Sequence, residues 1–289
     1  MSKLSPTLKS LINAPFARPG QAPAPHHIRD VYARIAKEAR ENKYGERPWI
    51  TISAAATFTL NSPASLAVLH NIASDPAFSS QTPLSAAEMI REIGLKCISF
   101  NGIPRTINSL GEFRGHILNA HPKLATQLEK RASRAPTAEN IEGINARGRA
   151  LWTSIYMPFD AKLESKLAES HPDLPVHILG SHYGPLLSDP AGDRGGLANV
   201  GRNSTSLVAI SCLRAQTGVG PQVLSHVFGL RKGVEQGAHN EEFKTAEAEA
   251  EGIERLATDE GCEWILKSVD SISEAIGANF AQHGRESKL

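Results

Sequence analysis

Residues 202–233, RNSTSLVAISCLRAQTGVGPQVLSHVFGLRKG, form the stretch of this sequence that decides the fold. Its first half carries an apolar stripe at three-residue steps, typical of a helix: Leu207, Ile210, Leu213. A corner of glycine and proline at 218–221 then interrupts the stripe, because these residues favour a turn. A second helix is predicted after the corner, with His226 near its start and Gly233 at its end. The stretch therefore predicts a helical hairpin.

Helical periodicity continues on both sides of this hairpin. Apolar residues recur at three- and four-residue steps in four further stretches: 28–42, 62–76, 83–102 and 262–280. The apolar run 49–58, WITISAAATF, and the glycine-containing run 175–187 are also expected to be helical, since no stretch alternates as a half-buried strand does. The predicted fold class is all-α.

The length of 289 residues suggests two domains or one duplicated domain, because domains commonly hold about 100–200 residues. We divide the chain into five parts, of which the polar stretch around 130–147 is the linker. The parts are a flexible N-terminal arm (1–27), an N-terminal helical repeat (28–129), the linker (130–147), a C-terminal helical repeat (148–283) and a C-terminal tail (284–289).

Charge and composition exclude several classes of protein. Lys and Arg number 31 against 30 Asp and Glu, so the chain lacks the excess of basic residues that nucleic-acid binding needs. No apolar run approaches the roughly 18 residues that cross a membrane, and the N-terminus lacks the apolar segment of a secretory signal. Three widely separated cysteines argue against a disulfide framework and favour a reducing compartment.

The two ends of the sequence carry possible targeting signals. The tripeptide Ser287, Lys288 and Leu289 has the form of a peroxisomal address, which an import receptor reads at the C-terminus. We therefore expect the peroxisomal matrix and that receptor as a partner. The alternative is a mitochondrial location, because the first 29 residues are basic and contain no acidic residue.

The hairpin at 202–233 resembles the core of the AhpD-like and carboxymuconolactone decarboxylase superfamily. In that family an arginine-led helix precedes a second helix with an early histidine and a closing glycine. A looser resemblance covers 148–283, and 62–76 with 85–110 resembles a degenerate second copy. The resemblance implies an AhpD-like helical bundle of two tandem repeats. Since a fused pair can replace one interface of the family's oligomers, it also implies a monomer or a homodimer.

The redox branch of this family is not matched by the residues of the hairpin. Its Cys-x-x-Cys motif falls here on Val219 and Gln222, and its relay glutamate falls near Leu207. None of these side chains can act as a thiolate or titrate as a carboxyl does. The sequence therefore argues against a thiol peroxidase of the Cys-x-x-Cys type.

The decarboxylase branch is the closer match, with Gln222 in place of its glutamate. The resemblance implies an enzyme without cofactor or metal that acts on a small carboxylated or lactone-type metabolite by a lyase-like proton transfer. His226 would be the acid–base group and Gln222 would orient the substrate. Arg202 would bind its carboxylate, and His182 with Tyr183 would complete the substrate site.

Two other classes of function remain open. One is a non-catalytic helical protein for binding or assembly, derived from the same fold, which the missing thiols and the glutamine favour. The other is an antioxidant role through an isolated cysteine, Cys97 or Cys212, although each is expected to be a small buried residue with no second cysteine nearby in sequence.

A metal site is not expected from the spacing of the histidines. His116 and His121, like His177 and His182, are five residues apart, whereas two ligands on one helix face are usually four apart. Histidines on separate helices could still converge. His70, which corresponds to His226 in the first repeat, is expected at the surface.

Overall fold

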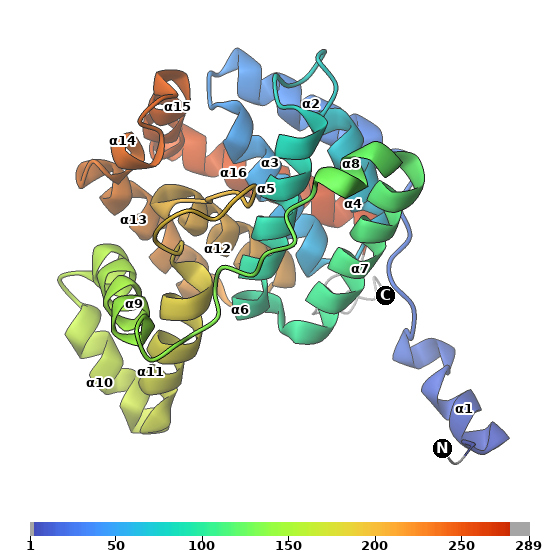
Figure 1. Ribbon diagram of the computed structural model, residues 1–289, viewed down its shortest axis with the longest axis horizontal. Helices are drawn as coiled ribbons and strands as arrows, with labels where there is room; N and C mark the ends of the chain where they lie inside the picture. Colours follow the sequence, from blue (N-terminus) through green and yellow to red (C-terminus); the bar gives the residue numbers. More distant parts are fainter. Residues whose placement is uncertain (1–2, 278–289) are drawn as a thin grey trace, which may run out of the picture.

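The computed structural model describes residues 3–277, and helices make up its architecture (Figure 1). The elements are α1 (Pro6–Ile12), the 3₁₀ turn η1 (Pro15–Ala17), α2 (Ile28–Glu41), α3 (Glu46–Thr59), α4 (Pro63–Ala73), α5 (Pro83–Lys96), α6 (Ile98–Asn101), α7 (Ile103–Ala120), α8 (Pro122–Gln127), α9 (Ile141–Tyr156), α10 (Asp160–Ser170), α11 (Asp173–His177), the π-helix η2 (Ile178–Leu187), α12 (Arg202–Gln216), α13 (Gly220–Glu235), α14 (Ala238–Glu242), α15 (Glu247–Leu256) and α16 (Asp259–Ile276). No residue of this described range lies in a strand, which confirms the all-α prediction.

Helices α3 and α12 form the centre of the molecule. Both are buried on almost every side, and they pack directly against each other. A helix with apolar or small residues all round, rather than along one stripe, is one that other elements surround. Some buried hydroxyl groups bond to carbonyls of their own helix: Thr57 donates to the carbonyl of Ser53 at 2.7 Å, and Ser211 donates to that of Leu207 at 2.8 Å.

Most buried apolar residues in the described range belong to one core, which joins the two halves of the chain. The core runs from Ile28 to Leu124 in the first half and from Val200 to Ile272 in the second. The two predicted repeats therefore share their core through α3 and α12 instead of folding around separate ones. A smaller apolar cluster lies where α9 meets η2: Leu151, Trp152, Ile155, Tyr183, Leu187.

The hairpins α3–α4 and α12–α13 have the same construction. Three residues, 60–62 and 217–219, connect the helices of each pair. In each pair the second helix has a proline in its first turn, Pro63 or Pro221, where the missing N–H is not needed. This similarity is what the predicted duplication of a helical unit would produce. The duplication itself stays a prediction.

Two partly buried glutamates cap the central helices. Glu249 of α15 accepts from the backbone N–H of Glu46 at 2.9 Å, and Glu242 of α14 accepts from that of Asn203 at 2.6 Å. A carboxylate at a helix N-terminus satisfies free N–H groups and interacts favourably with the helix dipole. Each carboxylate lies against a glycine with a positive φ, Gly45 at 86° or Gly201 at 92°, where a Cβ atom would collide with it. The segment α14–α15 thereby fixes the starts of both central helices.

The connections differ in part from the predicted ones. Within the predicted flexible arm, α1 forms a helix with no buried residue, and Figure 1 shows it apart from the main body. The linker predicted at 130–147 is too long, because α9 already begins at Ile141. Among the described residues, no helix has both the length and the apolar content required to cross a bilayer. The tripeptide 287–289 lies outside the described residues.

Candidate functional site

His226 lies in the first half of α13 and is buried, with 6% of its surface exposed. Its ring packs edge-on against Phe100 of α6 and Tyr156 of α9, with centroids 6.2 and 6.0 Å away. Burial, together with the positive charge of Arg202, lowers the pKa of His226 to about 4. The imidazole is therefore neutral at physiological pH.

Two tyrosines extend from His226 as a chain of polar atoms. The Tyr156 hydroxyl lies 3.4 Å from Nε2 of His226 and 3.0 Å from the Tyr183 hydroxyl. Burial raises the pKa of both phenols, so they stay protonated. The other ring nitrogen of His226, Nδ1, is buried and has no hydrogen-bond partner among residues 3–277. A neutral imidazole and two phenols are thus aligned so that a proton could pass along them.

Arg202 joins three helices beside this chain. Its Nε donates to the Ser154 hydroxyl at 2.6 Å, and its terminal nitrogens donate to the carbonyls of Ser154 and Gly229 and to the Ser206 hydroxyl, at 2.9 to 3.0 Å. Burial lowers the pKa of Arg202 to about 10, which leaves it charged at neutral pH. Because protein acceptors occupy most of its N–H donors, the guanidinium ties α9, α12 and α13 together.

The structure brings three of the five predicted site residues together, namely His226, Tyr183 and Arg202. Gln222 is exposed, one turn before His226. His182 is half-buried and places Nδ1 3.1 Å from the Ser99 hydroxyl, outside the histidine–tyrosine chain. Tyr156 was not among the predicted site residues, although its four-residue spacing from the buried Trp152 marks it as a residue of the inner face of α9.

The cysteines Cys97 and Cys212 are not isolated, contrary to the expectation from their separation in sequence. Their sulfur atoms lie 3.5 Å apart at the contact of α12 with the start of α6, and both side chains are fully buried. Burial raises the pKa of Cys97, so its reactive thiolate form is disfavoured. The Asn101 side chain adds a long contact of 3.9 Å to the Cys212 sulfur. The two thiols are therefore close enough to interact, but their burial protects them from reagents in solvent.

His70 is fully buried, which corrects the prediction that it lies at the surface. Its ring lies beside those of His116 and His121, at centroid distances of 5.7 and 5.3 Å. Burial lowers the pKa of His70 to about 4. The five-residue spacing of His116 and His121 does not keep them apart, because α7 ends at Ala120 and His121 lies just beyond the helix.

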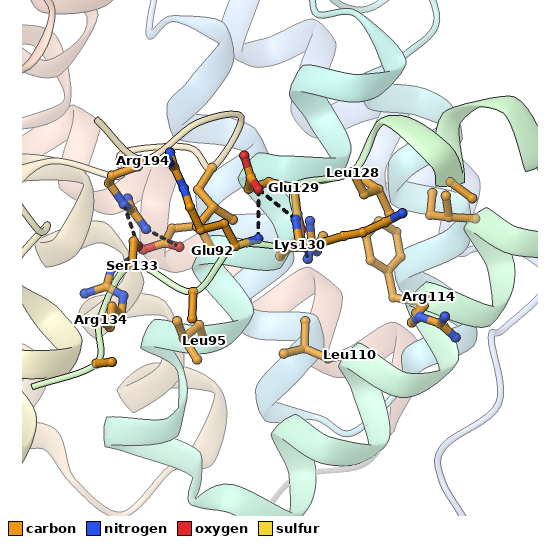
Figure 2. Close-up of a pocket in the computed structure, with 18 of the residues that line it drawn as sticks. Glu92, Leu95, Leu110, Arg114, Leu128, Glu129, Lys130, Ser133, Arg134 and Arg194 are labelled. Atoms are coloured by element: carbon orange, nitrogen blue, oxygen red, sulfur yellow. Dashed lines mark hydrogen bonds and ion pairs between the residues drawn. The ribbon is translucent and has the colours of Figure 1, made fainter. Parts of the chain in front are cut away.

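A hollow of about 720 Å³ lies between α5, α7 and the extended segment 128–135, and we call it the α5–α7 hollow (Figure 2). Its apolar lining is Leu95, Leu110, Phe113, Ile117, Leu118, Ala125, Leu128 and Leu197. At one end Glu92 pairs with Arg134 and with Arg194, the latter at 3.0 Å.

The basic residues of the α5–α7 hollow outnumber its acidic ones. The lining holds six cationic side chains, Arg91, Arg114, Lys130, Arg131, Arg134 and Arg194, and two carboxylates, Glu92 and Glu129. Within residues 3–277 neither Arg114 nor Lys130 takes part in an ion pair, and both are exposed. Figure 2 shows both away from the ion-paired end that contains Glu92. The hollow thus combines an apolar interior with unpaired positive charge at its rim.

Comparison with known proteins adds no identification: no family model, no curated protein and no solved structure matches this chain. Two features of the described residues are therefore the candidate functional sites: the histidine–tyrosine chain and the α5–α7 hollow.

Proposed function

We propose that this chain is an AhpD-like helical protein that binds a small carboxylated metabolite with an apolar body in the α5–α7 hollow. The observation that carries the proposal is the combination of an apolar lining with Arg114 and Lys130, which have no ion-pair partner among the described residues. The volume of about 720 Å³ is in the usual range for small-molecule sites, about 300–1,000 Å³.

The ligand class follows from the division of charge inside the hollow. Arg134 and Arg194 both pair with Glu92, and other N–H groups of both donate to protein oxygens, so that end offers few free donors to an anion. Arg114 and Lys130 can bind a carboxylate at the rim, because the guanidinium donates two parallel hydrogen bonds and the ammonium supplies a positive charge. The hydrocarbon part of the ligand would then contact Leu110 and the other apolar side chains.

Binding without turnover agrees with the state of the predicted catalytic groups. Arg202 is bound to protein acceptors, Gln222 is exposed, and the positions of the family's Cys-x-x-Cys motif hold Val219 and Gln222. A scaffold that lost its catalytic residues while retaining the helical bundle would have these features.

Calorimetry with decanoate, and with decanol as its uncharged match, tests the proposal. We expect decanoate to bind more tightly than decanol, and the double variant Arg114→Ala/Lys130→Ala to weaken decanoate binding by roughly tenfold, as expected for two exposed charge contacts. Lys123→Ala is the matched control, because Lys123 is an exposed cation on α8 outside the lining. Equal affinities for decanoate and decanol, or an unaffected double variant, would contradict the proposal.

A second candidate function is cofactor-independent proton transfer through His226, on a carboxylated or lactone-type substrate. The Nδ1 of His226, which has no partner among residues 3–277, and the link of Nε2 to Tyr156 and Tyr183 favour it, because a ring nitrogen that no protein group occupies is available to a substrate. A neutral imidazole can donate to a developing enolate oxygen, while Tyr156 completes the path of the proton.

The second candidate is tested on a panel of β-keto acids and carboxylated lactones, by release of CO₂ and by ring opening. We expect His226→Gln to abolish turnover and Tyr156→Phe to reduce it by about 10²-fold or more. The Arg114→Ala/Lys130→Ala variant serves as the matched comparison, since it alters the other site. Turnover that survives in His226→Gln would remove this candidate.

A further inference from the structure

Three histidines converge in the first half of the chain, away from His226. His70 comes from α4, His116 from the last turns of α7, and His121 from the position directly after α7. One ring nitrogen of each residue lies within 4.8 Å of a ring nitrogen of both others. The contact between α4 and α7 thus places three potential metal ligands around a common point.

Each of these histidines has a buried ring nitrogen without a hydrogen-bond partner in the described part of the chain. These atoms are Nδ1 of His70, Nε2 of His116 and Nε2 of His121. The other nitrogen of His70, Nε2, lies 3.0 Å from the carbonyl oxygen of Pro83. Since a carbonyl only accepts, Nε2 carries the ring proton and Nδ1 keeps its lone pair free. A backbone carbonyl that fixes the ring in this way is the usual outer partner of a metal-binding histidine.

The three rings are arranged with nearly threefold regularity. The three centroid distances are 5.3 to 5.7 Å, and every pair of rings is inclined by 76° to 78°. Zinc–nitrogen bonds of about 2.0–2.1 Å place tetrahedral ligand nitrogens roughly 3.4 Å apart. Small rotations of His116 and His121, both only half-buried, would bring nitrogens within 4.8 Å to that separation.

We propose that His70, His116 and His121 form a binding site for one divalent transition-metal ion of the zinc type. A set of imidazoles suits zinc, copper, nickel or cobalt, whereas magnesium and calcium prefer oxygen ligands. The site clips the C-terminal end of α7 to α4.

The site also has a route to solvent. A hollow of about 650 Å³ is lined by His121 together with Thr82 and Pro83, the residue whose carbonyl orients His70. Three protein ligands leave the fourth tetrahedral position for water or a small anion. The Phe113 ring packs against the rings of His70 and His116, with centroids 5.6 and 6.2 Å away, and adds an apolar neighbour to the cluster.

Titration of tag-free, chelator-treated protein with Zn²⁺ tests the site, with Co²⁺ as a spectroscopic probe of ligand geometry. We expect one equivalent of Zn²⁺ to bind per chain, a rise in Tm when it binds, and a tetrahedral Co²⁺ spectrum. His116→Gln and His121→Gln should each weaken binding by at least tenfold, since each removes one ligand.

His177→Gln is the matched control, because His177 belongs to a pair of neighbouring histidines, with His182 at 5.4 Å, that has no third member among residues 3–277. This variant should bind Zn²⁺ as the unmodified chain does. Circular dichroism of each metal-free variant establishes that it is folded. Because His116 and His121 are substituted separately, the second variant still tests the site if the first does not fold. Absence of stoichiometric binding, or binding that both Gln variants retain, would overturn the proposal and leave a cluster of core histidines.

Discussion

Replacing His226 by leucine should remove a large part of the protein's sensitivity to mild acid. His226 is buried and neutral, with its pKa lowered to about 4 by burial and by Arg202. In the unfolded chain the ordinary pKa of histidine is about 6.5. As pH falls below 6.5 this histidine becomes protonated in the unfolded chain but stays neutral in the folded one, so stability is lost between about pH 6.5 and pH 4.

The size of this loss follows from the two pKa values. At pH 7.5 neither state binds the proton appreciably. At pH 5 the unfolded histidine is almost fully protonated and the folded one is mostly neutral, which costs about 2 kcal/mol of unfolding free energy. His70, also lowered to about 4, adds a loss of the same sign, so His226→Leu keeps part of the pH dependence.

Urea unfolding at pH 7.5 and pH 5 measures the effect. The quantity of interest is the difference in unfolding free energy between the two pH values, which should be about 2 kcal/mol smaller in His226→Leu than in the unmodified chain. Any general destabilisation by the leucine cancels in this difference. His27→Asn, at an exposed ring before α2, is the control and should behave as the unmodified chain. An identical pH dependence in His226→Leu would refute the reasoning.

Two further predictions concern the core. Gly201→Ala should destabilise the fold by about 1–3 kcal/mol in thermal unfolding, because φ is positive at this position and the new Cβ atom would collide with the capping glutamate. Gly218→Ala is the control, since Gly218 also has a positive φ but has open space around it, and it should cost less. Equal losses of stability in the two variants would show that the collision is unimportant. Cys97 and Cys212 should resist alkylation at pH 8 in the folded protein and react in urea, and rapid labelling of the folded protein would contradict their protection in the core.

Periodicity predicted the helices that carry one apolar stripe. The predicted stretch 28–42 corresponds to α2, with Tyr32, Ile35 and Ala39 buried as their spacing requires. The shared core was not predictable in this way, because α3 and α12 are buried all round. The stripe of Leu207, Ile210 and Leu213 predicts a helix but does not indicate which elements surround it. The capping of both helices by α14 and α15 was missed for a similar reason, since Glu242 and Glu249 lie in an acidic stretch that looks solvated.

The candidate sites were harder to predict than the helices, since they depend on contacts between distant segments. His226, Tyr183 and Arg202 were found through the resemblance of one hairpin to a family, but Tyr156 enters from a helix 70 residues earlier. The pair Cys97 and Cys212 is separated by 115 residues, and no spacing rule connects them. The α5–α7 hollow has a wall in the segment that the sequence marked only as a linker.

The two hairpins show how similar backbone positions can acquire different chemistry. His70 is the eighth residue of α4 and His226 the seventh of α13, and burial lowers the pKa of both to about 4. Their neighbours differ: α7 and its end supply two further imidazoles to His70, whereas α9 and η2 supply phenols to His226. A cluster of imidazoles favours a metal ion, and an imidazole beside phenols favours proton movement. The third helix packed against each hairpin, more than the hairpin itself, therefore determines what each histidine can do.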